Sequence, residues 1–393
     1  GVQCDRQMVE SSIRIHDAET EALIAEAVRL TGVENPKSVQ QLTAWLEEET
    51  GEEVADLSKG TVAKMIDKLD EGKAKRVLEI RQELSKSSTK KYAAMLETIC
   101  DDGRIRGLFQ FYGANRTGRW AGRLVQVHNL PRNDLPAIEL ARGYAAHGDA
   151  QALKLLYGSL SDTLSQLIRT ALIARPFTSL HVADFSAIEA RVLAWLAGEQ
   201  WRLEVFKTHG KIYEASASQM FGVPIEQIGK GSELRQKGKV AELALGYQGG
   251  VGALISMGAL DMGLSEDELP EIVERWRNAN RAIVEFWRSI EGAALHAVQT
   301  GEAVGLRGLV IAREMDSRTG QDFMTVRLHS GRKLYYPRPH ITENQFGRPA
   351  IHYYGVEGGK WSVLSTYGGK LTENIVQAIS RDCLAAAMMK LDA

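Results

Sequence analysis

The chain has 393 residues, enough for two or three domains that each bury a sizeable hydrophobic core. It is 44% hydrophobic and 25% charged, and its formal net charge of −2 gives by itself no support to nucleic-acid binding. We expect no signal peptide and no membrane span, because no apolar run approaches the roughly 18–20 residues that a span needs. Three widely spaced cysteines argue against a zinc site and a disulfide framework, and favour a reducing, cytoplasmic compartment.

The first hundred residues are highly charged and predict a helical region. Apolar residues recur at helical spacing between turn and cap signals. The predicted helices are Asp5 to Leu30, a second that ends at Thr50, Thr61 to Leu69, and about Ala74 to Leu84. A cluster of hydroxyls and lysines without an acid follows, Ser85 to Tyr92. Such donors bind phosphate oxygens without regard to base sequence; the alternative is an exposed junction between helices.

The composition changes sharply between Gly103 and Arg132. This segment of thirty residues contains no Asp or Glu and six arginines: Arg104, Arg106, Arg116, Arg119, Arg123 and Arg132. An unbalanced cationic segment with glycine breaks suits a path for a polyanionic backbone, whereas a solvated loop more often carries mixed charge. The segment therefore favours nucleic-acid binding. Residues 133–175 predict two or three helices that serve packing.

An apolar, β-prone run from Ser179 to Ala183 ends at Asp184, and helical periodicity begins at Ser186. This pattern predicts a buried strand with a carboxylate at its end. A carboxylate in such a place needs a cation or a metal. The alternative is that Asp184 caps the following helix.

The stretch from Arg235 to Tyr247 predicts a helix that carries Arg235, Lys239, Leu243 and Tyr247 four residues apart, on one face. Two cations, an apolar surface and a phenol follow one another along this face. A nucleoside triphosphate presents phosphates, sugar and base in the same order. The alternative is a solvated basic helix. Further on, the sequence predicts helices from Glu266 to Gln299, β hairpins within residues 309–356, and a last helix from about Lys370 to Leu391.

These motifs resemble those of the family A, DNA polymerase I-like, polymerases, and more narrowly of the phage-type members. The run from Asp184 to Arg191, Asp-Phe-Ser-Ala-Ile-Glu-Ala-Arg, is similar to the Asp-Tyr-Ser-x-Ile-Glu-x-Arg of the family. Arg235, Lys239 and Tyr247 match its Arg-x3-Lys-x7-Tyr. Thr117-Gly118-Arg119, the segment ending at Asn129-Leu130-Pro131, and Gln377 resemble its contacts with primer and template.

The resemblance implies a mostly helical α+β fold, the right hand of thumb, palm and fingers with a small antiparallel palm sheet. Residues 1–100 would form the thumb. The first part of the palm, with the primer–template strip and the Asp184 strand, would span residues 101–195. The fingers would span residues 196–345, with a hairpin region near their end, and the second part of the palm residues 346–393.

The resemblance also implies which residues perform the chemistry. Asp184 and the backbone carbonyl of Phe185 would bind two Mg²⁺ ions. Arg235 would grip the γ-phosphate and Lys239 the α-phosphate of the incoming nucleotide. Tyr213 stands where many relatives have a phosphate-contacting histidine.

Other residues would select the nucleotide and hold DNA. Leu243 and Tyr247 would form the wall beside the base and sugar. Glu189 would be the steric gate against a ribose 2′-hydroxyl, and we predict that its carboxylate meets the Tyr247 hydroxyl. Duplex phosphates would lie on the thumb residues, and sequence-independent minor-groove contacts would come from the palm; the predicted DNA-binding residues are Lys86, Ser87, Ser88, Thr89, Lys90, Arg119, Gln126, His128, Asn129 and Gln377.

One element of the family pattern is not found, a short His-Asp-Glu hairpin that carries a second metal-binding aspartate. With one carboxylate, two divalent ions are poorly held, so we expect weak activity or none from this chain alone. The chain would then be a fragment of a longer polymerase, a polymerase whose palm a second polypeptide completes, or a protein that binds without turnover. The expected function is template-directed DNA synthesis from dNTPs, in a bacterial or phage-infected cytoplasm. The alternatives are a non-catalytic DNA- or nucleotide-binding module and, disfavoured by Glu189, a relative of single-subunit RNA polymerases.

Overall fold

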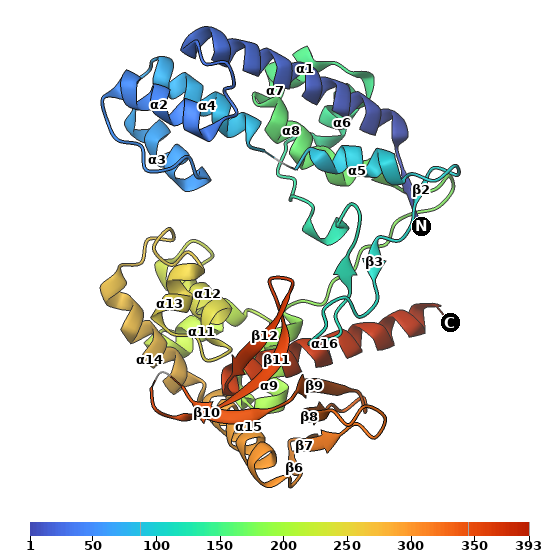
Figure 1. Ribbon diagram of the computed structural model, residues 1–393, viewed down its shortest axis with the longest axis vertical. Helices are drawn as coiled ribbons and strands as arrows, with labels where there is room; N and C mark the ends of the chain where they lie inside the picture. The colour runs from blue at the N-terminus through green and yellow to red at the C-terminus, as the bar shows by residue number, and fades with distance from the viewer. Residues whose placement is uncertain (87, 345, 393) are drawn as a thin grey trace. The chain divides into compact units, whose positions relative to one another are not determined.

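The computed structural model describes residues 1–86, 88–344 and 346–392, which divide into two units (Figure 1). Unit 1 consists of residues 1–110 and 120–182. Unit 2 consists of residues 111–119 and of the chain from Ala183 onward. None of the described helices is both long enough and apolar enough to cross a membrane.

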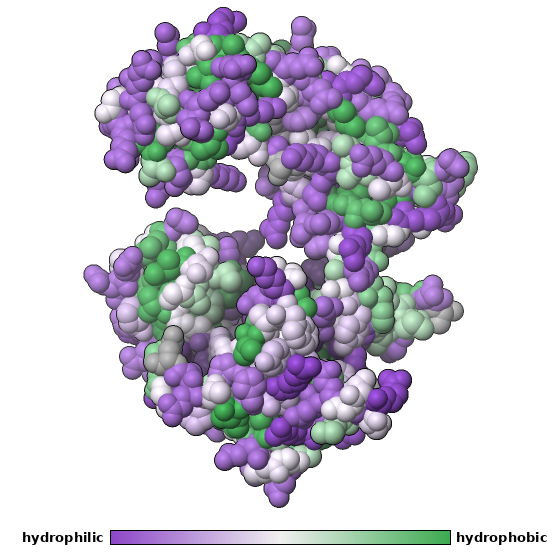
Figure 2. Space-filling model, in the orientation of Figure 1, coloured by the Kyte–Doolittle hydropathy of each residue, from purple (hydrophilic) through white to green (hydrophobic). Residues whose placement is uncertain are grey.

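Unit 1 is built mainly from helices, as the sequence predicts. The first helix begins where the Asp5 carboxylate accepts a hydrogen bond from the Met8 amide, and it ends at Gly32, which takes the left-handed conformation (φ 68°) that favours glycine. Hydrophilic residues dominate the face of this unit in Figure 2. Its helices are α1 (Arg6–Thr31), α2 (Val39–Thr50), α3 (Lys59–Lys68), α4 (Lys73–Leu84), α5 (Lys90–Thr98), α6 (Ile138–His147), α7 (Ala150–Tyr157) and α8 (Leu160–Leu167).

Short strands and 3-10 turns connect these helices. β1 (Val2–Cys4) pairs antiparallel with β2 (Arg104–Ile105) on one side and β5 (Leu172–Ile173) on the other. β3 (Phe109–Gln110) pairs with β4 (Ala121–Gly122), and η1 (Val127–Asn129) and η2 (Ile168–Ala171) are 3-10 turns. The main core of the unit includes Met8, Tyr92 and Leu164. The Tyr92 hydroxyl donates to the Leu164 carbonyl and so satisfies its polar group inside this core.

Unit 2 places its helices around one large core that includes Trp276, Phe286, Trp287 and Ile375. The helices are α9 (Ile188–Ala197), α10 (Gln200–Lys207), α11 (Ile212–Phe221), α12 (Glu233–Leu245), α13 (Val251–Ser256), α14 (Leu269–Ala279), α15 (Arg281–Thr300) and α16 (Gly368–Asp392), with 3-10 turns η3 (Ile225–Gln227) and η4 (Glu266–Glu268).

Two antiparallel sheets complete unit 2 (Figure 1). The first has the order β6 (Val304–Leu306), β7 (Leu309–Met315), β8 (Asp322–Arg327) and β9 (Lys333–Pro337). The second has the order β10 (His340–Glu343), β11 (Pro349–Glu357) and β12 (Lys360–Thr366). The predicted hairpins between residues 309 and 356 are confirmed, and β6, β10 and β12 are additional strands that the sequence pattern did not indicate.

The predicted buried strand before Asp184 is wrong. Residues 178–185 have no regular secondary structure, and Val182 is 93% exposed. A strand requires a neighbouring backbone to satisfy its N–H and C=O groups, and none of the described strands pairs with this run. The alternative is also wrong, because α9 begins at Ile188 and its N-cap position is Ala187. The helix predicted from Arg235 to Tyr247 is shorter than expected, because α12 ends at Leu245, two residues before Tyr247.

Candidate active site

A cavity of about 410 Å³ in unit 2 lies among α9, α11, α12 and the segment that precedes α9. Six predicted site residues line it: Asp184, Phe185, Glu189, Tyr213, Leu243 and Tyr247. Helix α12 supplies Leu243 from its last turn, and Gly246 keeps right-handed helical dihedrals, so Tyr247 still follows on the same side. The structure thus brings together three segments that are separated in the sequence by some twenty to sixty residues.

The Glu189 carboxylate lies between two partners at this cavity. The Tyr247 hydroxyl donates to Glu189 Oε2 at 3.0 Å, which confirms the predicted contact. Arg119 Nη1 lies 3.7 Å from Glu189 Oε1. Burial, together with the charge of Glu189, raises the pKa of Tyr247 well above its ordinary value. The phenol therefore stays protonated at neutral pH and holds the carboxylate in one place.

The two predicted phosphate-binding cations of α12, Arg235 and Lys239, lie on the turns that precede the cavity. Arg235 does not line it, because Arg235 Nε donates to Glu214 Oε1 at 2.7 Å and the guanidinium lies 5.5 Å from the centroid of the Tyr213 ring. Burial opposes ionisation of Glu214, but the hydrogen bond and charge of Arg235 outweigh it, and the pKa of Glu214 falls below its ordinary value. Lys239 is half-buried one helical turn before Leu243, about 6 Å along the axis.

A buried ionic network holds α12 in place, and two of its members, Arg202 and Glu242, line the cavity. Arg202 is 1% exposed and forms a two-pronged ion pair with Glu242, with Nη1 donating to Oε1 at 2.8 Å. The Trp276 indole also donates to Glu242, at 3.0 Å, and Asn280 accepts from Arg202 at 3.0 Å. Sequence reasoning missed this network. The available signal was the position of Glu242, which lies one turn after Gly238 and three residues before Leu245, and so on the same helix face as a residue that is buried.

Helices α11 and α12 approach each other closely at Gly238. A Cβ atom there would lie 2.3 Å from the Tyr213 carbonyl oxygen, nearer than atoms can pack. This approach holds Tyr213 and Glu214 of α11 beside the cationic side chains of α12. The indole of Trp287 adds a second anchor, since it donates to the Gly246 carbonyl at 3.1 Å, next to Tyr247.

Asp184 is exposed, which differs from the buried carboxylate that we expected. No three His, Cys, Asp or Glu side chains among residues 1–86, 88–344 and 346–392 are grouped to hold a metal. Carboxylate and carbonyl oxygens are nevertheless the donors that Mg²⁺ takes, and it usually binds through one or two carboxylates together with substrate phosphates. The oxygens of Asp184 and Phe185 fit that pattern of coordination.

The segment 111–119 belongs to unit 2 and places Arg119 beside Glu189. Arg332 joins it through Nη1 to the Tyr112 hydroxyl at 3.1 Å, and Arg381 Nε donates to the Gly118 carbonyl at 2.9 Å. Asp382 holds Arg332 in turn, at 2.9 Å. The predicted minor-groove residue Gln377 lies on α16, where its amide donates to Glu373 at 3.2 Å. The anchoring arginines were not predicted as site residues.

Unit 1 has its own polar cavity of about 940 Å³, and it gathers five of the predicted DNA-binding residues: Lys86, Ser88, Lys90, Gln126 and Asn129. Lys86 lies 2.8 Å from both Glu83 and Asp162, so its charge is locally balanced. Lys90 is exposed at the start of α5. Lys91, which belongs to the predicted cluster of hydroxyls and lysines, donates to the Val125 carbonyl at 2.7 Å, and burial lowers its pKa.

Other predicted DNA-binding residues lie elsewhere. Thr89 is 4% exposed and its hydroxyl lies 3.2 Å from His16 Nε2, so its position does not support the predicted phosphate contact. His128 is exposed but does not line the cavity. Ser87 lies outside the described residues. Part of the cationic segment is also balanced locally, since Arg106 lies 2.6 Å from Asp102, one residue before the acid-free stretch begins.

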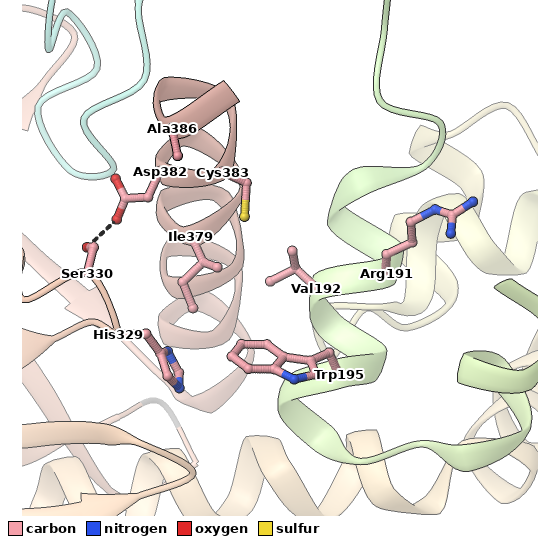
Figure 3. Close-up of a pocket in the computed structure, with 9 residues that line it drawn as sticks. All are labelled: Arg191, Val192, Trp195, His329, Ser330, Ile379, Asp382, Cys383 and Ala386. Carbon is pink, nitrogen blue, oxygen red and sulfur yellow. Dashed lines mark hydrogen bonds between the residues drawn. The ribbon is translucent and has the colours of Figure 1, made fainter. Parts of the chain in front are cut away.

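A third, largely apolar cavity of about 580 Å³ separates α9 from α16 (Figure 3). Val192 and Trp195 line it from α9, and Ile379 and Cys383 from α16. The ring of Trp195 lies 4.7 Å from that of His329 at its edge. No predicted site residue lines this cavity.

The sequence model of DNA polymerase family A matches residues 6–321. The chain belongs to this family. A DNA polymerase of Bacillus phage SP02 is 54% identical over 395 residues, which cover 100% of this chain and 60% of that protein. DNA polymerase I of Mycobacterium tuberculosis (strain H37Rv) is 27% identical over 154 residues, 39% of this chain and 14% of that protein. The thermostable DNA polymerase I of Thermus thermophilus is 43% identical over 65 residues, 16% of this chain and 8% of that protein.

A solved structure supports the fold of this family A chain. It is the POL domain of Pol1 from M. smegmatis, in complex with DNA primer-template and dNTP. The match has a TM-score of 0.60 at 17% identity, and covers 100% of this chain and 57% of that one. The predicted mostly helical α+β fold is thereby confirmed. The chain spans 60% of the length of the phage relative.

Proposed function

We propose that this chain carries the nucleotide-binding and DNA-binding machinery of a template-directed DNA polymerase, which transfers nucleotidyl groups from dNTPs to a primer 3′-hydroxyl. The observation that carries the proposal is the Glu189–Tyr247 contact, 3.0 Å long, at a cavity beside the cationic turns of α12. Membership of DNA polymerase family A supports it. In this proposal unit 1 includes the thumb, and the remaining boundaries are those expected from the resemblance.

The incoming nucleotide would lie along α12. Its phosphates would meet Lys239 and Arg235, and Arg235 would exchange the Glu214 carboxylate for a phosphate, a partner to which a guanidinium binds equally well through two hydrogen bonds. The base and sugar would lie against Leu243 and Tyr247. This order follows from the positions of Arg235, Lys239 and Leu243 on α12 and of Tyr247 two residues after its end.

The sugar would be selected by Glu189. Two contacts fix its carboxylate, one from Tyr247 and one from Arg119, so it cannot easily swing away from an added hydroxyl. A ribose 2′-hydroxyl at this position would have to displace one of these partners. We infer that the site prefers deoxynucleotides for this reason.

Mg²⁺, when bound, would polarise the α-phosphate and lower the pKa of the primer hydroxyl. Asp184 and the Phe185 carbonyl would hold it together with the triphosphate. Their exposure in this structure leaves them accessible to a metal that arrives with its nucleotide. Lys239 would balance the charge that develops on the α-phosphate.

Primer extension with Mg²⁺ and dNTPs tests the proposal. We expect Asp184→Ala to abolish extension, while Asp261→Ala, at an exposed aspartate elsewhere in unit 2, leaves it unchanged. Nucleotide binding should survive Asp184→Ala in part, because the α12 contacts remain. A chain that binds DNA and dNTP but never extends a primer would favour the alternative, a non-catalytic binding module.

A further inference from the structure

The sheet β10–β11–β12 presents one face to the core of unit 2 and the other outward. Ile351 and Tyr353 are each 2% exposed, so their side chains define the inner face of β11. Side chains alternate along a strand, so His352 and Tyr354 lie on the outer face. The register carries this face across the sheet, because His340 pairs with His352 and Trp361 with Val356. Trp361 is 56% exposed there.

Aromatic rings form a continuous ladder over this outer face. His352 and His340 are stacked with centroids 5.8 Å apart, and His340 lies 6.3 Å from Tyr354. Tyr354 and Trp361 are stacked at 6.3 Å, with 25° between their planes. The Arg338 guanidinium lies 5.5 Å from the centroid of the Tyr354 ring. Flat rings interleaved with a guanidinium are the surface on which unpaired nucleobases stack, whatever their sequence.

A polar cavity of about 930 Å³ lies beside the aromatic ladder, and His352 of the ladder lines it. His352, Ser365 and Tyr367 line it from the sheet, and Gln248 from the end of the nucleotide helix region. Gln248 accepts a hydrogen bond from the Gly369 amide at 2.8 Å, which fixes it in place. Its neighbour Tyr247 lines the nucleotide cavity. Consecutive residues, Tyr247 and Gln248, therefore line the nucleotide cavity and the polar cavity respectively.

We propose that the outer face of β10–β12 and the polar cavity beside it bind the unpaired part of the template strand ahead of the copied position. The inference rests on the proposed function, because a base that pairs with a nucleotide beside Tyr247 is followed by bases without partners. These bases would stack on the ladder. The exposed cations Arg338, Arg348 and Lys360 would meet the phosphates.

Two carboxylates at the cavity, Glu291 and Glu343, oppose a purely electrostatic attraction. Stacking must therefore supply most of the affinity, and the face favours single strands, whose bases are free, over duplex, whose bases are already stacked. This balance separates the outer face from the lysine-lined cavity of unit 1, where phosphate contacts would dominate.

Fluorescence anisotropy with the whole chain tests the inference. The probes are a primer–template with a 5′ overhang of about a dozen thymidines, long enough to cover a single-strand site, and a blunt duplex of the same paired length. Trp361→Ala should weaken overhang binding at least about fivefold, the equivalent of one lost base stack, and leave blunt-duplex binding unchanged. Trp361→Phe should keep most of the affinity. Arg338→Ala should cost about twofold or more on the overhang alone.

The matched control is Tyr335→Ala, which removes a 55% exposed aromatic from β9 in the neighbouring sheet and should change neither affinity. Thermal melts establish that each variant is folded. Overhang binding that does not respond to Trp361→Ala or Arg338→Ala overturns the inference alone and leaves a protein partner as the occupant of this face. Wild-type chain that binds neither DNA overturns the inference and the proposed function together.

Discussion

At the scale of single residues, the candidate site depends on side chains held by partners rather than left free. Glu189 lies between Tyr247 and Arg119, and Arg235 is paired with Glu214. These contacts fix the positions of the Glu189 carboxylate and the Arg235 guanidinium, whereas the resemblance implied only their roles. Each role can therefore be tested separately. Removing the Tyr247 hydroxyl or the Glu214 carboxylate would change the position of its partner side chain, whereas removing Glu189 or Arg235 would remove the functional group itself.

Glu189→Ala should relax sugar selection. The variant removes the carboxylate that would exclude a 2′-hydroxyl, so we expect the ratio of ribonucleotide to deoxynucleotide incorporation to rise about tenfold or more. Single-nucleotide extension with each substrate measures the ratio, and competition binding serves if extension is slow. Tyr247→Phe, which keeps the ring and loses one hydrogen bond, should raise the ratio less. An unchanged ratio in Glu189→Ala would refute the gate assignment.

The Glu214–Arg235 pair should make stability depend on pH in the acid range. The pKa of Glu214 is lowered in the folded protein from an ordinary value of 4.5. The unfolded chain therefore binds a proton more readily, so the pair contributes its full stability above about pH 4.5 and loses it as pH falls through the folded pKa. Urea unfolding of wild type and Glu214→Gln at several pH values measures this. The two proteins should differ in stability at neutral pH and converge as the pH falls below the ordinary glutamate pKa of 4.5.

At the scale of elements, α12 is the part of unit 2 on which the candidate site depends. Buried groups hold it through Glu242, and a close approach holds it against α11, at Gly238. Breaking a buried ion pair at one partner costs roughly 3–5 kcal/mol because a charge is left without compensation. The positions of Leu243 and Tyr247 thus depend on contacts made by other residues of α12, namely Gly238 and Glu242.

Gly238→Ala should destabilise the chain and weaken nucleotide binding. The added Cβ would lie 2.3 Å from the Tyr213 carbonyl oxygen, so α11 and α12 must move apart, at a cost of about 1–3 kcal/mol. The control is Gly292→Ala in α15, where nothing lies within 4 Å of the new Cβ; there, helix propensity predicts stabilisation of about 1 kcal/mol. Urea unfolding and dNTP titration measure both. Equal behaviour of the two variants would contradict the close-approach argument.

At the scale of the whole molecule, the positive charge is concentrated locally, although the chain as a whole is not basic. The net charge is −2, yet unit 1 gathers lysines around one polar cavity. Affinity for DNA then depends on which cations remain unbalanced. Lys86 is surrounded by Glu83 and Asp162, whereas Lys90 is exposed.

Lys90→Ala should therefore weaken duplex binding more than Lys86→Ala. A lysine that contacts one phosphate contributes about 0.9 to the slope of log K against log salt concentration, and we expect Lys90→Ala to reduce the slope by about that amount. Titrations of a blunt duplex at several salt concentrations measure it. A larger loss in Lys86→Ala would show that its carboxylate partners release it on binding.

The sequence by itself determined most helices of both units, though not α5 and α13, and it also determined hairpins between residues 309 and 356 and the order of Asp184, Glu189, Arg235, Lys239 and Tyr247 along the chain. These features are local, since periodicity, caps and turn residues act within a few positions. The strand predicted before Asp184 failed because a strand depends on a partner backbone, which no local pattern contains.

Only the tertiary structure decided which of these residues meet. It brought Glu189 to Tyr247, as expected, and it also paired Arg235 with Glu214, buried Thr89 against His16, and paired Arg202 with Glu242 of α12. The aromatic ladder over β10–β12 arises in the same way, from the register of three strands. The physical reason is that contact energies between distant segments depend on packing and burial, which the order of residues does not specify.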